Sequence, residues 1–445
     1  MAKKLWEKTV SVDQDVEKYT VGRDREMDIM LAPWDVIGSL AHIRMLESIG
    51  LLTAKELKEL TKSLRQIYRQ TLSANFKIDE GIEDIHSYVE LLLTQKLGDL
   101  GKKIHAGRSR NDQVLLDLKL FMRAKIEQLT AAVKRFFDTL ISKSEQHRND
   151  IIPGYTHLQV ATPSSMGLWF GSYAESLTDD MLTLAAAYEI VDRNPLGSAA
   201  GYGSSFPLNR EMTTALLGFG TPAVNVVYAQ MGRGKTERIV AQAIANIAST
   251  IGKLSFDACL FNSQNFGFIT LPQEYTTGSS IMPHKKNPDV FELTRSKCNR
   301  IQALPYEITL ITNNLPSGYF RDLQLIKENF LGVFDEMISI LDMVGKMIEG
   351  VKINDISGDT RYDLMYSVEE VNKRVQEGQP FRDAYKEVGI EIENNHFSAN
   401  KELNHTHLGS IGNPGNDLIE KRMNEILKRM DFKKWHKAVE KLTGI

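Results

Sequence analysis

Apolar side chains recur at steps of three and four residues along the stretch 113–150, which contains neither proline nor glycine. Such steps bring side chains onto one face of a helix, whereas a half-buried strand alternates at every second residue. The apolar positions are Leu115, Leu118, Met122, Ile126, Leu129, Val133, Phe136 and Leu140. We therefore predict a single helix of roughly 55 Å that packs lengthwise along other helices.

Four more stretches have the same pattern, and connectors that contain glycine or proline separate them. Each stretch is long and apolar on more than one face, and a helix of this kind needs more than one packing partner. The stretches are residues 166–191, 236–261, 287–312 and 322–348. The sequence thus predicts a bundle of five long helices that also buries surface against other subunits.

Smaller helical units are expected on both sides of this bundle. In residues 1–105, Thr53 is placed to cap a helix, and Glu56 three residues later completes a capping box. Residues 106–350 are the central five-helix domain, and the more polar residues 351–445 are a C-terminal helical domain. No alternating strand pattern of useful length stands out. The predicted fold class is mainly α, with three helical domains.

Composition excludes several classes of function. Lys and Arg number 54 against 57 Asp and Glu, so the formal charge of −3 gives no overall attraction to nucleic acid or anionic lipid. The two cysteines, Cys259 and Cys298, provide neither a disulfide framework nor a CxxC site, which favours a reducing, cytoplasmic setting. The N-terminal MAKKLWEKTV and the rest of the chain lack a long uncharged apolar run, so we expect neither secretion nor membrane insertion.

The connector IHAGRSRNDQV, residues 104–114, precedes the longest helix. Arg108, Arg110 and Asn111 lie at or just before the helix N-terminus, where backbone N–H groups and the helix dipole favour an anion such as a substrate carboxylate. The alternative is that Ser109, Asn111 or Asp112 only caps the helix and that the arginines are solvated. The residues alone leave these two interpretations open.

The connector IIPGYTHLQVATP, residues 151–163, carries Thr156 and His157 between two prolines and a glycine. We expect this stiff backbone, rather than a flexible tip, to hold the imidazole, so that His157 can act as an acid or a base. A single histidine is a weak signal, and a structural hydrogen bond is the alternative role.

The connector QEYTTGSSIMPHKKNPDVFE, residues 273–292, combines small hydroxyl residues with a cation. Ser279 lies in a glycine-serine turn, and Lys285 and Asn287 lead into a helix that carries Glu292. The composition favours catalysis, and the alternative is a mobile surface loop in which asparagine caps the helix.

The string GSSIMPHKKNP in this last connector resembles the signature loop of the fumarase/aspartase superfamily. Members of that superfamily break a C–N or C–O bond beta to a carboxylate and release fumarate or a close relative. Within it, SRNDQV (109–114), GYTHLQVATP (154–163) and YFRDLQLIK (319–327) resemble the argininosuccinate lyase family more than fumarase, aspartase or adenylosuccinate lyase. The resemblance covers about residues 20 to 330.

This resemblance implies an elimination of fumarate from argininosuccinate that leaves arginine, without a metal or an organic cofactor. It also implies a homotetramer, in which the five-helix bundles of four subunits form a twenty-helix core and each active site combines segments of three subunits. The alternatives are another fumarate-releasing lyase such as adenylosuccinate lyase, a non-catalytic relative like the lens crystallins of this family, or a helical scaffold that binds partners.

The resemblance also assigns roles to individual residues. Ser279 corresponds to the catalytic base, and Lys285 and Asn287 to the groups that hold the substrate carboxylate. His157, polarised by Glu292, corresponds to a proton donor for the departing nitrogen. The remaining residues that match substrate-binding positions are Ser39, Arg110, Asn111, Thr156, Tyr319, Gln324 and Lys327.

Overall fold

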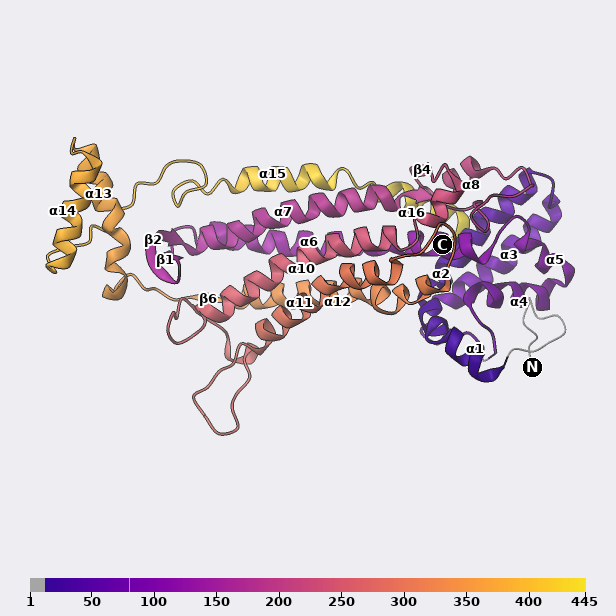
Figure 1. Cartoon of the computed structure of the whole chain (residues 1–445), viewed down its shortest axis with the longest axis horizontal. Coiled ribbons are helices and arrows are strands. Elements are labelled where there is room, and N and C mark those ends of the chain that lie inside the picture. Colours follow the sequence, from indigo (N-terminus) through magenta and orange to yellow (C-terminus); the bar gives the residue numbers. More distant parts are fainter. Residues whose placement is uncertain (1–12, 80) are drawn as a thin grey trace.

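The computed structural model describes residues 13–79 and 81–445, so the whole N-terminal segment MAKKLWEKTV lies outside the described residues. The chain is an elongated, mainly helical molecule, and its first described helix (Gln14–Val21) and its C-terminus lie at the same end of the long bundle (Figure 1). The predicted mainly α class is therefore confirmed. The five long helices are α6 (Arg110–Gln146), α7 (Met166–Val191), α10 (Lys235–Phe261), α11 (Asp289–Thr312) and α12 (Ile326–Gly350).

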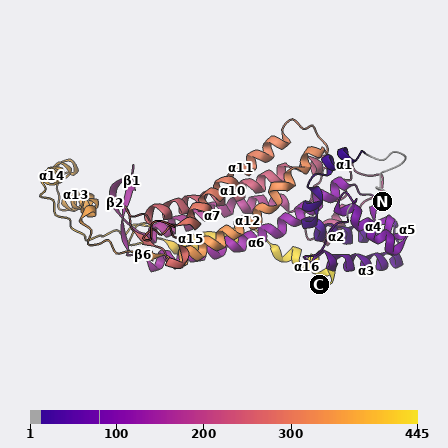
Figure 2. The same ribbon diagram turned by 90° about the horizontal axis from the view of Figure 1, so that it is seen from below.

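The bundle core forms because the apolar seam of α6 is covered on its whole length. All the seam residues predicted from Leu115 to Leu140 are buried. Helix α6 packs against α7 and α12, and α10 packs against α7 and α11, so that every long helix contacts at least one other long helix (Figures 1 and 2). Fully buried phenylalanines such as Phe170, Phe330 and Phe334 fill the space between them.

The N-terminal helices form a second hydrophobic core next to the start of α6. Thr53 and Glu56 make the predicted capping box at the start of α3. Helix α2 is the central element of this part and contacts α3, α4 and α6. The helices here are α1 (Gln14–Val21), α2 (Asp24–Ser48), α3 (Ala54–Thr71), α4 (Ile85–Leu97), α5 (Asp99–Lys102) and the 3-10 helix η1 (Lys103–His105).

The segment expected to be one C-terminal domain is spread over the length of the molecule (Figure 1). Helices α13 and α14 pair beyond one end of the bundle, with a small core of their own around Val371, Ala384 and Val388. Helix α15 runs back along α7, and α16 contacts α2. There, the ring centroids of Trp435 and Trp34 lie 6.1 Å apart. The apolar face of α15 packs against the bundle, and that of α16 packs against α2. The bounds are η4 (Thr360–Tyr366), α13 (Ser367–Gln376), α14 (Phe381–Glu393), α15 (Asn416–Leu427) and α16 (Phe432–Thr443).

A β-hairpin that the hydrophobic pattern does not predict follows α6. Strands β1 (Ile151–Thr156) and β2 (Gln159–Ser165) pair antiparallel, with Pro153 opposite Pro163. Prolines and a bulge in the pairing interrupt the alternation by which a strand is recognised, which is why the expectation of no useful strand was wrong here. The other short elements are β3 (Arg193–Asn194), α8 (Arg210–Leu216), β4 (Thr221–Pro222), α9 (Val226–Met231), β5 (Ile269–Thr270), η2 (Gln273–Tyr275), η3 (Arg321–Gln324) and β6 (Lys352–Ile353).

Two helices, α2 and α10, are long and apolar enough to cross a membrane by length and composition alone. Their apolar windows are 72% and 67% buried inside the molecule, respectively. Both helices lie within the hydrophobic cores described above, so their apolar character is explained by packing.

Helices α6 and α7 approach each other closely at Gly167, which generates a prediction. A Cβ atom at this position would lie 2.5 Å from Arg148 Cα and 2.6 Å from the Ser144 carbonyl oxygen, both of them backbone atoms. We expect Gly167→Ala to lower the unfolding free energy by about 1–3 kcal/mol, because rigid backbone must move. Gly389→Ala, inside α14 with open space around it, is the matched control and should be neutral or stabilising. Thermal unfolding of the two variants measures this difference, and equal midpoints would contradict the close approach.

Candidate active site

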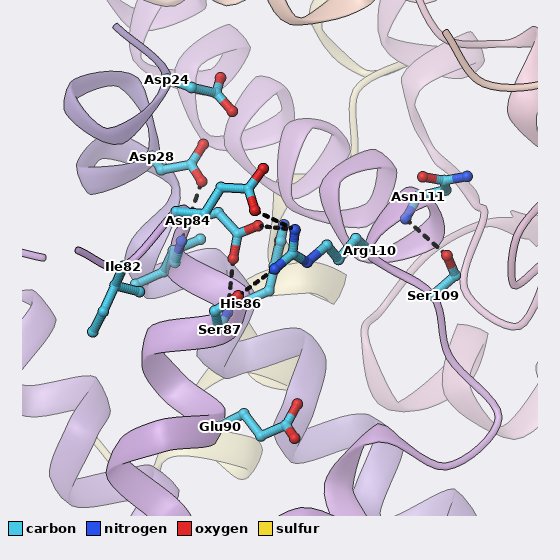
Figure 3. A network of polar contacts seen from close by, with 12 residues as sticks. Asp24, Asp28, Ile82, Asp84, His86, Ser87, Glu90, Ser109, Arg110 and Asn111 are labelled. Atoms are coloured by element: carbon cyan, nitrogen blue, oxygen red, sulfur yellow. Dashed lines mark hydrogen bonds and ion pairs between the residues drawn. The ribbon is translucent and has the colours of Figure 1, made fainter. Parts of the chain in front are cut away.

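A polar cavity of about 140 Å³ lies where α2, the segment before α4, the start of α6 and residues 319–327 meet. Figure 3 shows side chains from the first three of these segments. It brings together residues that are far apart in the sequence. Five of the predicted substrate-binding residues line it: Arg110, Asn111, Tyr319, Gln324 and Lys327. The structure therefore assembles most of the predicted binding residues at one end of the bundle.

Arg110, the first residue of α6, is held by acidic groups. Its guanidinium donates to Glu83 Oε2 at 3.1 Å and to Ser87 Oγ at 2.6 Å, and it lies 3.2 Å from Asp84 Oδ2 (Figure 3). Burial alone would lower the pKa of Arg110, but the Asp84 and Glu83 carboxylates raise it. Ser109 caps α6 and shares a capping box with Asp112. The capping interpretation is thus correct for Ser109 and Asp112, while the idea of a solvated Arg110 is wrong.

Lys327 is 3% exposed and forms ion pairs with Asp24 and, at 2.7 Å, with Asp28 Oδ1. Burial favours a neutral amine, but the two carboxylates outweigh it and raise the pKa of Lys327. Close by, Arg233 forms an ion pair with Glu237 at 2.9 Å. The cavity wall therefore carries charges of both signs in contact with each other.

The segment after α11 forms the other wall of the cavity. Gln324 donates to the carbonyl oxygens of Thr20 and Val21 at 3.2 and 3.1 Å, and Arg321 donates to Glu83 Oε1 at 2.9 Å. Tyr319 is 38% exposed beside them. These bonds tie the segment to the N-terminal helices and to the same acidic group that holds Arg110.

Ser39 does not line this cavity, contrary to its predicted role in substrate binding. It is fully buried on α2, and its hydroxyl accepts a hydrogen bond from Arg108 at 2.9 Å. The contact explains the discrepancy, because the serine faces the interior behind the cavity and orients an arginine there.

Thr156 and His157 lie at the exposed tip of the β1–β2 hairpin, at the other end of α6. Thr156 pairs with Gln159, so His157 and Leu158 form a two-residue turn, with φ angles of 53° and 56°. Two residues with positive φ in such a turn are typical of type I′, and non-glycine residues rarely adopt this backbone. The prolines lie toward the base of the hairpin, and His157 is part of its two-residue turn.

Ser279 lies in an 11-residue loop whose ends, Thr277 and Asn287, are joined by two backbone hydrogen bonds of 2.9 and 3.3 Å. The Ser279 hydroxyl oxygen accepts the backbone N–H groups of Ile281 and Met282 at 3.3 and 3.1 Å. Hydrogen bonds donated to this oxygen favour its negatively charged form. The geometry is thus suited to a serine that gives up its proton.

The two charged residues assigned to catalysis near this loop are both exposed. Lys285 is in the loop itself, and Glu292 lies on the first turn of α11. Within the described residues, neither Glu292 nor His157 makes a side-chain hydrogen bond or ion pair, so one chain does not form the predicted Glu292–His157 contact. Both side chains are free to contact another molecule.

One chain does not bring the three groups of predicted residues together. Helix α6, with 37 residues, separates Arg110 from the hairpin by about 55 Å. Helix α11, with 24 residues, separates the Ser279 loop from Tyr319 by about 36 Å. Figure 1 shows the hairpin and the N-terminal helices at opposite ends of the bundle, and the loop between α10 and α11 extends away from it.

A larger cavity of about 610 Å³ lies beside the hairpin, between α7, α10 and α15. Its walls are mostly apolar, with Trp169, Phe256 and Phe261 among them, and its charged lining residues are the acidic Glu175 and Asp257. None of the predicted site residues line it, and two carboxylates without a cation do not suit an anionic substrate.

Sequence reasoning missed the acidic residues of the polar cavity. Asp24 and Asp28 are one helical turn apart on α2, and Glu83 precedes α4. Acidic residues at such spacing usually mark a solvated helix face, so the sequence pattern did not predict that they line a cavity. A further missed cluster consists of Asp35, His86 and Asp117, whose ligand-type atoms all lie within 4.8 Å of one another and which is the only such candidate metal-binding group among the described residues.

Known proteins provide an independent comparison. Residues 7–303 match the protein family described as "Lyase". An argininosuccinate lyase of Parabacteroides distasonis is 63% identical over 443 residues, which are 99% of each chain. One of Stenotrophomonas maltophilia (strain R551-3) is 38% identical over 87% of this chain and 90% of its own. A solved EDDS lyase in complex with formate shares the fold, with a TM-score of 0.74 at 19% identity, over 98% of this chain and 95% of that one.

Motifs, helical architecture and the near-complete match to sequence relatives point the same way. The family match spans the N-terminal helices, α6, α7 and α10, and the Ser279 loop. The chain belongs to the argininosuccinate lyase family.

Proposed function

We propose that this protein is an argininosuccinate lyase, which eliminates fumarate from argininosuccinate and leaves L-arginine, in the cytoplasm and as part of arginine biosynthesis. The observation that carries the proposal is the 63% identity to a curated argininosuccinate lyase over 99% of both chains. The polar cavity adds chemical support, because it has charges of both signs for a substrate that carries both.

The chemistry requires a proton to leave the carbon next to a carboxylate of the succinyl group. Such a carbon is a weak acid, so the charge that develops on the carboxylate must be stabilised by cations or amides already in place. We assign the base to Ser279, whose oxygen accepts two backbone N–H groups. Lys285 and Asn287, from the same loop, would hold the carboxylate. In this proposal the ammonium of Lys285 would stabilise the negative charge of the intermediate.

The departing guanidino nitrogen must gain a proton as the C–N bond breaks. We assign this donation to His157, with Glu292 as the carboxylate that polarises it. General acid catalysis of this kind contributes roughly 10²- to 10⁴-fold to the rate. The exposed position of both side chains, with no partner among the described residues, supports a contact that forms only with substrate and a second chain.

The amino-acid end of the arginine moiety would bind in the polar cavity, together with Arg110, Asn111, Tyr319 and Gln324. This end carries an ammonium and a carboxylate, and the cavity offers Lys327 beside Asp24 and Asp28. A cavity with both signs of charge can pair each group of a zwitterion with an opposite charge. Thr156 would contact the substrate from the hairpin.

We propose a homotetramer in which three chains contribute to each active site. The lengths of α6 and α11 support this, since the hairpin, the loop and the polar cavity cannot meet within one chain. Large apolar side chains are exposed on the loop and on α11, such as Ile281 at 82%, Leu293 at 62% and Tyr306 at 67%. Exposed apolar surface of this extent is typical of an interface between chains.

A substrate panel tests the activity. The wild-type protein should release fumarate, followed by ultraviolet absorbance, from argininosuccinate but not from adenylosuccinate, aspartate or malate. Release from adenylosuccinate instead would assign the chain to a different lyase reaction, and no release from any substrate would leave a non-catalytic relative.

Ser279→Ala should abolish turnover, because it removes the proposed base. Ser280→Ala is the matched control, since this neighbouring serine is exposed on the same loop, and it should retain activity. The measurement is the steady-state rate, with circular dichroism to verify that both variants are folded. Near-normal turnover by Ser279→Ala would remove the serine from its role as the base.

Lys327→Met should destabilise the fold and weaken substrate binding. It leaves the buried Asp28 and the half-buried Asp24 without the Lys327 ammonium, and the loss of one partner of a buried ion pair reduces the unfolding free energy by about 3–5 kcal/mol. Adding Asp28→Asn should restore part of the stability but not the affinity, because the surplus charge is removed while the ammonium stays absent. A single variant as stable as wild type would contradict the ion-pair geometry.

Mixed tetramers test the shared site. Ser279→Ala removes the proposed base, and Asn111→Ala removes an amide from the polar cavity about one helix length away. Hybrids of these two inactive parents should regain activity, because some sites would draw an intact Ser279 from one chain and an intact Asn111 from another. Hybrids verified by native mass spectrometry that stay inactive would contradict the proposed shared site.

A further inference from the structure

His86, on α4, faces carboxylates from two other helices. Its Nδ1 lies 2.8 Å from Asp35 Oδ1 on α2 and 3.6 Å from Asp117 Oδ2 on α6. All three side chains are buried, with relative exposures of 8%, 2% and 1%. Gln113 adds a hydrogen bond of 3.3 Å to Asp35. One ring nitrogen thus faces carboxylates of two other helices and adds to the polar contacts that join α2, α4 and α6.

Two positively charged groups face the buried acidic residues of this cluster. The guanidinium of Arg108 is close enough to influence both Asp35 and Asp117. The second cation is His86. Burial opposes its charge, but the hydrogen bond and charge of Asp35 and then the charge of Asp117 raise the pKa of His86 to about 10.

The two carboxylates respond differently to this environment. Burial would raise the pKa of Asp35, but the hydrogen bond from His86 lowers it below its usual value. Burial, and then the nearby charge of Asp35, raise the pKa of Asp117. The other titratable groups that face the cluster are Asp84, which caps α4, His105 from the segment before α6, and Asp28 on α2.

The cluster lies directly behind the polar cavity. Asp35 is seven residues, or two helical turns, after Asp28 on α2, and Asp117 is seven residues after Arg110 on α6. Each pair therefore shares a helix face. His86 itself lines the cavity (Figure 3), and the next residue, Ser87, accepts a hydrogen bond from Arg110.

We propose that His86 is a positioning residue: as a buried imidazolium it holds Asp35 and Asp117 together, and thereby fixes the spacing of Asp28 and Arg110 across the substrate cavity. This inference rests on the proposed function of that cavity. The competing occupant of the same three ligand atoms is a metal ion, which would require a neutral His86.

The key variant is His86→Asn, whose side-chain amide can take the position of Nδ1 as a donor but carries no charge. We expect kcat/KM for argininosuccinate to fall about 10²-fold, because the side chains that line the cavity shift out of position. The change should appear mainly in KM, because these side chains bind the substrate rather than react with it. Adding Asp117→Asn removes the surplus carboxylate and should recover roughly tenfold, as for residues coupled in one charge network. A purely steric role would not give this recovery.

The stability of the protein at different pH provides a readout that needs no activity. Folding raises the pKa of His86 from 6.5 to about 10. The protonated imidazole therefore stabilises the folded protein fully below pH 6.5, and this contribution is lost as the pH rises toward 10. The difference in thermal midpoint between wild type and His86→Asn should follow this course.

The matched control is His42→Gln, because His42 is also fully buried and its ring bonds to the Ala106 carbonyl oxygen. Burial lowers the pKa of His42, so its contribution to stability should instead decrease as the pH falls below 6.5. The His42→Gln difference should therefore change in the opposite direction to the His86→Asn difference.

Three results would overturn the proposal. These are a His86→Asn variant within twofold of wild type in kcat/KM, a stability difference that does not change with pH, or one tightly bound metal per wild-type chain whose removal by a chelator reproduces the variant. If the wild-type protein does not turn over argininosuccinate but its stability depends on pH as predicted, the proposed function would be overturned. The role of His86 in holding Asp35 and Asp117 together would then remain.

Discussion

The length and stiffness of α6 constrain every interpretation of the site. The helix starts at the polar cavity with Arg110 and ends just before the hairpin with His157, about 55 Å away. A packed helix cannot shorten or fold back, because its buried apolar side chains pack against neighbouring helices along its whole length. The long bundle therefore keeps these segments apart within one chain, and under the proposed function its two ends and the Ser279 loop serve one reaction only when chains associate. The exposed apolar residues of α11 are consistent with such an association.

The two kinds of site element are built from different electrostatics. Around the polar cavity, charges are buried in compensated groups, such as Lys327 with Asp28 and His86 with Asp35. Such groups hold helices in a defined register, because moving one partner would leave a charge uncompensated. The Ser279 loop makes no such ion pairs with the part of the chain that the structure describes, and backbone hydrogen bonds fix it at its base. A rigid end for binding and a loop for chemistry would let the protein recognise the substrate precisely and still close over it.

Hydrophobic periodicity was sufficient to predict the long helices, and α7 has the predicted bounds of residues 166–191. Periodicity could not reveal the hairpin, since Pro153 and Pro163 break the alternation of its strands. Motif resemblance identified five residues that line the polar cavity but also selected Ser39, which is buried behind it. Asp24 and its neighbours were missed because a carboxylate on a helix looks solvated until its cation is known. Contacts between helices decide these cases, and a single sequence does not contain them.

The central claim is that one substrate is contacted by three distant segments from different chains. A structure of the assembled protein with argininosuccinate bound, prepared with an inactive Ser279→Ala variant, tests it most directly. The account predicts position 279 from one chain, His157 from a second and Lys327 from a third around the same ligand. A ligand contacted by a single chain, or one bound away from the loop that contains position 279, would contradict it.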